Sequence, residues 1–164
     1  MSSAQYYIDL LDLLPHPEGG YFKEVYRDPI TYPPHHNFQG ERNYSTSIYY
    51  LLQQGNKSCF HRIKSDEIWH HYVGDCILIH YFENDELITK KLGKNLEEDE
   101  LPQVVVPKNT WFAAEPAADC EYALMGCTVA PGFNFLDFEM ASLMDLKAFL
   151  ANHKSLINKL VKAH

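Results

Sequence analysis

Alternating apolar and polar positions run through the middle of the chain and predict short β-strands. A two-residue period places every second side chain on the same face of a sheet. Turn-forming pairs such as Gly74-Asp75 and Asn84-Asp85 separate the alternating runs. Many short strands between such turns are typical of a β-sandwich or a β-barrel. The predicted strands are 21–27, 46–52, 58–63, 67–73, 77–83, 104–106 and 123–129.

Helical patterns are confined to the two ends of the chain. Residues 3–14 carry apolar side chains behind a serine start and predict a short helix. This helix should end before Pro15, because the residue before a proline is steered away from helical angles. Near the other end, Ser142 and Asp145 fit a capping box ahead of an apolar face, which predicts a helix. A second short helix is predicted near 155–161.

The size and charge of the chain narrow the class of protein. Its 164 residues, 46% of them hydrophobic and 22% charged, suit one domain with one core. We expect a single domain over 1–164, mainly β, with a barrel at about 17–139 and C-terminal helices at about 142–162. The net charge of −8 argues against a nucleic-acid partner, because phosphate binding uses clustered Lys and Arg.

The chain shows no signal-like segment and no long apolar run, so we expect a cytoplasmic protein with no membrane partner. Its four cysteines lack a CxxC spacing. Such cysteines are typical of buried thiols rather than of a zinc site or disulfides.

The most informative stretch begins at Gly55 and ends at Gly74. Between them stand His61, Ile63 and Glu67, separated by one and three residues. This spacing resembles the first cupin signature, G-x5-H-x-H-x3-E-x6-G, with Ile63 in place of the second histidine. Positions 61 and 63 of one strand point to the same face, and a turn after them would bring Glu67 back beside them.

A second stretch, Pro107-Lys108-Asn109-Thr110-Trp111-Phe112, resembles part of the second cupin signature, G-x5-P-x-G-x2-H. Asn109 stands at the glycine position and Phe112 at the histidine position. Wider motifs are similar to an uncharacterised small cupin family of the Cupin_5 type, and they occupy 17–22, 42–52, 61–69 and 130–139. The resemblance implies a double-stranded β-helix, or RmlC-like jelly-roll barrel, and a homodimer. It implies no established reaction.

Two of the four metal ligands of a metal-bearing cupin are therefore replaced. Zinc or iron usually takes at least three protein ligands, so we expect no metal and no other cofactor. The alternative is a divalent metal held by His61, Glu67 and His71, because His71 would share a strand face with Glu67. A histidine that only packs inside the barrel is the other interpretation of His71.

Inward-facing side chains would form a pocket for a small molecule. His61 and Glu67 are the predicted catalytic residues, because a partly desolvated histidine beside a carboxyl group suits proton transfer. A structural His–Glu pair that satisfies two buried polar groups is the alternative. Glu18 and Glu24 could lie at the pocket mouth, although surface positions are favoured. The predicted ligand-binding residues are Thr46, Tyr50, Ile63, Trp69, His71, Trp111 and Phe112.

These observations predict a cupin that binds a small polar metabolite and acts as a metal-independent sugar epimerase or isomerase. The activity is an analogy with the fold, which does not fix function. The alternatives are a degenerate metal-dependent dioxygenase or lyase and a non-catalytic binding protein. The open sheet edge at 21–27 is expected to pair with a second subunit in a homodimer.

Overall fold

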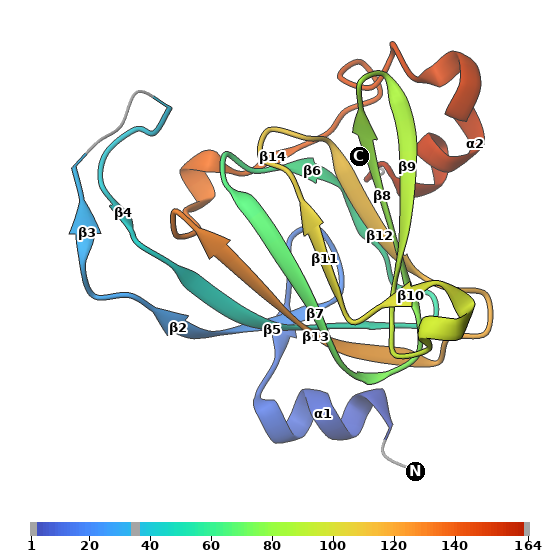
Figure 1. Ribbon diagram of the computed structural model, residues 1–164, viewed down its shortest axis with the longest axis horizontal. Helices are drawn as coiled ribbons and strands as arrows, with labels where there is room; N and C mark the ends of the chain where they lie inside the picture. The colour runs from blue at the N-terminus through green and yellow to red at the C-terminus, as the bar shows by residue number, and fades with distance from the viewer. Residues whose placement is uncertain (1–2, 34–36, 163–164) are drawn as a thin grey trace.

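The computed structural model describes residues 3–33 and 37–162, and its strands form two six-stranded sheets that face each other (Figure 1). The first sheet has the order β1-β2-β5-β13-β7-β11, and the second has the order β10-β9-β8-β12-β6-β14. The predicted all-β jelly-roll fold with a helix toward each end is confirmed. The first sheet comprises β1 (Leu14–Pro15), β2 (Tyr21–Arg27), β5 (Thr46–Gln53), β13 (Tyr122–Ala130), β7 (Asp66–Gly74) and β11 (Gln103–Val106).

Antiparallel pairing dominates the second sheet, where only β9 and β10 run parallel among the described strands. A separate two-stranded ribbon of β3 (Thr31–Tyr32) and β4 (Arg42–Asn43) extends beyond the first sheet (Figure 1). The second sheet comprises β10 (Glu100–Leu101), β9 (Glu86–Leu92), β8 (Ile77–Glu83), β12 (Phe112–Pro116), β6 (Ser58–Arg62) and β14 (Glu139–Met140). Two short 3-10 helices, η1 (Leu96–Glu98) and η2 (Phe135–Asp137), interrupt the connections.

The main core lies between the two sheets. Tyr50 and Leu52 of β5 and Trp69 of β7 meet Ile77 and Ile79 of β8 there, and all five side chains are buried. The β5 side chains between these positions point the other way, so β5 is buried on both faces. This burial explains the nearly continuous apolar run of β5.

Each helix covers the outer face of one sheet. Helix α1 (Ala4–Leu11) places Ile8 against Leu51 and Leu124 of the first sheet. Helix α2 (Leu150–Leu160) belongs to a cluster that includes Phe60 and Phe82 of the second sheet. No helix within residues 3–33 and 37–162 is long and apolar enough to cross a membrane.

The N-terminal helix is shorter than predicted. Ser3 caps its first turn by accepting a hydrogen bond from the backbone N–H of Tyr6 at 3.3 Å. Asp12 ends the helix three residues early, because its backbone adopts a left-handed conformation with φ of 51°. Leu14 and Pro15 then form β1, which pairs with the start of β2.

The C-terminal region also differs from the prediction. The expected capping interaction forms, since the backbone N–H of Ser142 donates to the Asp145 carboxylate at 2.8 Å. However, residues 143–149 form successive turns, and one regular helix begins at Leu150. Strands β9 and β12 were also missing from the prediction, as were the two-residue strands β1, β3, β4, β10 and β14. Three of the seven residues of β9 are charged and exposed, which weakens its alternating pattern, and β12 is a short strand that ends in a proline.

The loop between β1 and β2 is held tightly against β5 and β6. The hydroxyl of Tyr50 donates to the carbonyl of Gly19 at 2.7 Å, and the N–H of Cys59 donates to the carbonyl of Glu18 at 2.9 Å. Gly19 has φ of 117°, and a side chain at this position would overlap the carbonyl oxygen of Lys57. The glycine is therefore needed both for its conformation and for the close approach.

We expect Gly19→Ala to destabilise the protein by at least about 2 kcal/mol more than Gly55→Ala. Gly55 also has a positive φ, 84°, but a methyl group at this position would meet no atom within 4 Å. The pair of variants therefore separates steric overlap from conformational strain. Urea unfolding of both proteins measures the difference, and equal losses of stability would contradict close packing of the loop.

Candidate functional site

A cavity of about 320 Å³ lies between the two sheets at the end of the barrel near the β1–β2 loop. Its polar wall carries His16, Glu18, His61 and Glu67. The rest of its wall is mainly apolar, with side chains of β2, β5, β6 and β13 and of the segment that follows β13. We define the mouth of the cavity as the lining residues Glu24, Arg27, Phe133, Asn134 and Phe135.

His61 and Glu18 share a proton at the wall of the cavity. The imidazole Nδ1 of His61 lies 2.7 Å from the carbonyl oxygen of Cys59, and its Nε2 lies 3.0 Å from Glu18 Oε2. Both ring nitrogens thus face oxygen acceptors, so a proton must lie between Nε2 and Oε2, on the ring or on the carboxyl group. The hydroxyl of Ser58 donates to the other Glu18 oxygen at 2.8 Å. Both side chains of the pair are buried.

His16 holds its proton on the other nitrogen. The backbone N–H of Glu18 donates to His16 Nδ1 at 3.2 Å, which fixes the ring proton on Nε2. Although Nδ1 also lies 3.5 Å from the Glu18 carboxylate, its lone pair is already used, so this contact is not an ion pair. Burial lowers the pKa of His16 and keeps its ring neutral.

Glu67 enters the cavity from β7 in the first sheet, whereas His61 enters from β6 in the second. Burial, followed by the nearby charge of Glu18, raises the pKa of Glu67 to about 8. Glu67 therefore holds a proton at neutral pH. Cys127 lies beside it, and burial raises the pKa of this thiol well above its ordinary value, so the thiol is protonated as well.

The charged groups at the mouth are paired with each other. Arg27 donates to both carboxylate oxygens of Glu24, at 2.8 and 2.7 Å. The same guanidinium donates to the Asn43 side chain at 2.7 Å and to the Phe133 carbonyl at 3.2 Å. Its charge is thus already neutralised, and its hydrogen bonds fix the position of the segment after β13.

A buried ion pair holds that segment from its other end. Arg42 of β4 donates to both oxygens of Asp137, at 2.6 and 2.8 Å, and both side chains are buried. Asp137 ends η2, the 3-10 helix that carries Phe135. The pair therefore fixes the aromatic side of the cavity mouth.

Comparisons with known proteins agree with this architecture. The family model described as "Cupin superfamily (DUF985)" matches residues 5–141. The chain belongs to the cupin superfamily. An uncharacterised protein of Saccharomyces cerevisiae, YML079W, is 31% identical over 150 residues, which cover 83% of this chain and 74% of the yeast protein.

Solved structures of two other cupin-like relatives superpose over the full fold. A hypothetical protein from Leishmania major has a TM-score of 0.90 and 30% identity, with 99% of this chain and 100% of that chain covered. A protein from Shewanella oneidensis has a TM-score of 0.89 and 36% identity, with both chains covered completely.

The cupin cavity brings together five of the residues predicted from the sequence: Thr46, Tyr50, His61, Ile63 and Glu67. Two further predicted residues, Trp69 and Phe112, lie in the core beneath them. The centroid of the Phe112 ring lies 4.1 Å from that of His61. Phe112, at the histidine position of the cupin signature, therefore shields His61 with an apolar ring.

His71 and Trp111 lie away from the cavity. His71 follows Trp69 along β7 and does not line the cavity, and its Nε2 lies 3.1 Å from the carbonyl oxygen of Asp75. Trp111 packs with the C-terminal cluster, and the guanidinium of Arg62 lies 4.3 Å from its ring centroid. Adjacent positions 111 and 112 point to opposite faces.

Glu18 is the main correction to the sequence prediction. A surface position was favoured for this carboxylate, yet it is buried and paired with His61. The β1–β2 loop turns it inward through two glycines with positive φ. The two glycines after Glu18 were the available signal, since they indicate a tight backbone. His16 and Cys127 are further cavity residues that the sequence reasoning missed.

The residues present do not fit a metal centre. Among residues 3–33 and 37–162, no group of three or more His, Cys, Asp or Glu side chains is arranged to hold an ion. The alternative set of His61, Glu67 and His71 is not assembled, because His71 lies outside the cavity.

The raised pKa of Glu67 predicts a pH-dependent stability. Between the ordinary value of 4.5 and about 8, the folded state keeps a proton that the unfolded state releases. The free energy of unfolding should therefore fall with rising pH across this range, by up to about 1.4 kcal/mol per pH unit. Glu67→Gln should remove this slope in denaturant unfolding series.

Glu86→Gln is the control, because Glu86 is an exposed residue of β9 and should leave the slope unchanged. Equal slopes for the wild-type protein and Glu67→Gln would show that Glu67 does not carry the buried proton.

Proposed function

We propose that this cupin binds a small polar metabolite between its sheets and transfers a proton on it without a metal, as an epimerase or isomerase does. The observation that carries this proposal is the proton shared by His61 and Glu18, which faces a second titratable group, Glu67, in the same cavity. The yeast relative is itself named uncharacterised, so the proposal depends on the site.

The His61–Glu18 pair suits the role of the acid, and Glu67 suits the role of the base. If the His61–Glu18 pair gave its proton to a substrate oxygen, Nε2 and Oε2 would face each other as two acceptors at 3.0 Å. Two facing acceptors hold a proton strongly, so the pair would lend its proton to the substrate oxygen only while the intermediate exists and would take it back when the carbonyl group forms again. Glu67, once ionised, is the base that removes a proton from a carbon next to the polarised oxygen.

The base form of Glu67 becomes populated as the pH approaches about 8. We therefore expect turnover to rise with pH toward that value. Apolar side chains around both groups limit water and strengthen their interactions with a substrate. Isomerisation of an aldose and a ketose, or inversion next to a carbonyl group, needs only such a pair of proton-transfer groups.

The test is exchange of carbon-bound hydrogen in heavy water, followed by NMR with unphosphorylated glucose, mannose and fructose. We expect deuterium incorporation next to the carbonyl carbon, and losses of about 100-fold or more in His61→Gln and Glu67→Gln. Arg62→Gln is the matched control, because Arg62 follows His61 on β6 but pairs with Glu139 outside the cavity.

Exchange that is equally fast in wild type and His61→Gln would exclude the proposed proton transfer. A folded wild-type protein that exchanges no hydrogen in these sugars, but binds one of them unchanged, would instead identify a non-catalytic binding protein.

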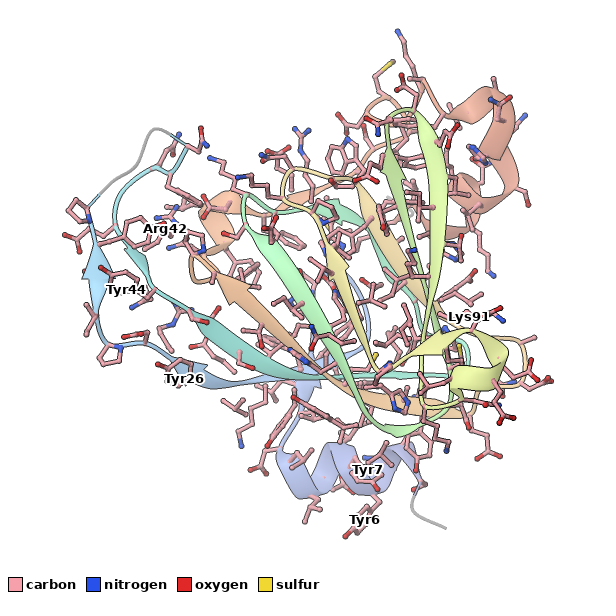
Figure 2. All side chains as sticks on the ribbon, in the orientation of Figure 1. Tyr6, Tyr7, Tyr26, Arg42, Tyr44 and Lys91 are labelled. Carbon is pink, nitrogen blue, oxygen red and sulfur yellow. The ribbon has the colours of Figure 1, made fainter. Side chains whose placement is uncertain are left out.

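We also propose that a second copy of the chain covers the open edge of the first sheet. Strand β2 pairs with β5 along its length, but β1 reaches only Tyr21 and Phe22 on its other side. The edge beyond them exposes Val25 and Tyr26, which are 46% and 49% accessible. Figure 2 shows Tyr26 on the same side of the molecule as Tyr44, another exposed aromatic side chain.

A dimer should give a native mass of 38.0 kDa, twice the 19.0 kDa of one chain. Tyr26→Lys should weaken it, because a charge would enter the covered apolar edge. Leu96→Lys, on exposed η1, is the control and should leave the dimer intact. Native mass spectrometry distinguishes these masses, and a wild-type monomer at micromolar concentration would contradict the proposal.

A further inference from the structure

We propose that the cavity selects an uncharged ring compound, with an apolar face and with hydroxyl or carbonyl oxygens at its edge. This inference rests on the proposed function and narrows its substrate class. It disfavours phosphorylated and nucleotide-linked sugars, whose phosphate groups would lie in the cavity or at its mouth. The argument starts from the charges of the cavity wall.

Among the described residues of the cavity wall, every cationic group is paired. Arg27 is bound by both oxygens of Glu24 and by two further acceptors. His16 is neutral, because its Nδ1 accepts the Glu18 N–H. A phosphate or carboxylate group would therefore enter the cavity without a counter-ion, which is costly in a buried site.

The described part of the wall likewise presents no unpaired anionic group at neutral pH. The His61–Glu18 pair has no net charge whether the shared proton lies on Nε2 or on Oε2. Glu67 keeps its own proton, and the titratable groups packed around it are Glu18 and the protonated thiol of Cys127. An ammonium group would also be desolvated without a partner.

The groups that remain are hydrogen-bond donors. His16 Nε2 makes no hydrogen bond within the described residues, and the protonated carboxyl of Glu67 has a hydroxyl to give. Both suit an oxygen acceptor of the ligand. These donors are well matched to sugar hydroxyls and ring carbonyls.

The aromatic residues at the mouth of the cavity require that the ligand also has an apolar face. Phe135 lies on the cavity wall although its side chain is 54% exposed, and its ring is nearly parallel to that of His16, with 6.3 Å between the centroids. Phe22 and Phe133 also line the cavity. A ring that covers Phe135 would bury this exposed aromatic surface, and a volume of about 320 Å³ has room for one such ring compound.

The test compares matched probes by ligand-observed NMR titration at pH 7. The first set is benzyl alcohol, benzoate and benzylamine, and the second is glucose and glucose 6-phosphate. We expect the neutral member of at least one set to bind at least about tenfold more tightly than its charged relatives. Phe135→Ser should weaken that binding, because it removes the aromatic ring that the ligand would cover. Phe135 is exposed, so this substitution should not disturb the core.

A second arm raises the pH to 9 with the neutral probe that binds. Ionised Glu67 would lose its donor and present an anion to the probe oxygen, so wild-type affinity should fall about tenfold. Glu67→Gln keeps a neutral donor and should bind equally at both pH values, although it cannot exchange carbon-bound hydrogen.

Tighter binding of benzoate, benzylamine or glucose 6-phosphate would overturn the inference. So would binding unaffected by Phe135→Ser, or no binding of any probe by folded wild-type protein. If the wild-type protein bound the neutral probe but exchanged no carbon-bound hydrogen, only the proposed catalysis would fail. Failure of the proposed catalysis can therefore be distinguished from failure of the proposed ligand class.

Discussion

The buried proton shared by His61 and Glu18 is the interaction on which the rest of the site depends. It requires the Glu18 carboxylate to lie inside the barrel, which the Gly19 conformation and the Tyr50 hydrogen bond make possible. The same carboxylate contributes to the raised pKa of Glu67. The β1–β2 loop thus places one carboxylate beside two groups that come from different sheets, His61 as a direct partner and Glu67 as a nearby charge.

The cupin barrel has kept its cavity while losing the usual ligands. Ile63 and Phe112 stand where the signatures have histidines, and both are buried beside His61 or the cavity. An apolar neighbour strengthens electrostatic interactions and excludes water, whereas a histidine would add a competing polar group. With these apolar residues in place of two histidines, the site keeps acid–base groups in a mainly apolar cavity.

The outer layers depend on polar contacts as well as on apolar packing. On the second sheet, Glu115 of β12 pairs with Lys159 of α2 and lies 3.4 Å from His80 Nε2. Beside the first sheet, Arg42 of the β3–β4 ribbon pairs with Asp137 and holds the segment that carries Phe135. Partners so far apart in sequence leave no local pattern. Strand alternation is a local pattern, and it predicted the two-sheet fold. The turns of 143–149 and the weakly apolar strand β9 were missed, because contacts between distant residues cannot be read from a local pattern.

The sequence by itself determined the barrel and half of the site. Strand alternation and the spacing of His61, Ile63 and Glu67 identified the inward-facing positions, because side-chain direction along a strand is a local property. Only the tertiary structure decided which inward positions reach the cavity. It placed His71 beyond Trp69, and it buried Glu18 against a histidine 43 residues later in the sequence. The depth of a cavity and the partner of a buried charge depend on long-range packing, which no local pattern encodes.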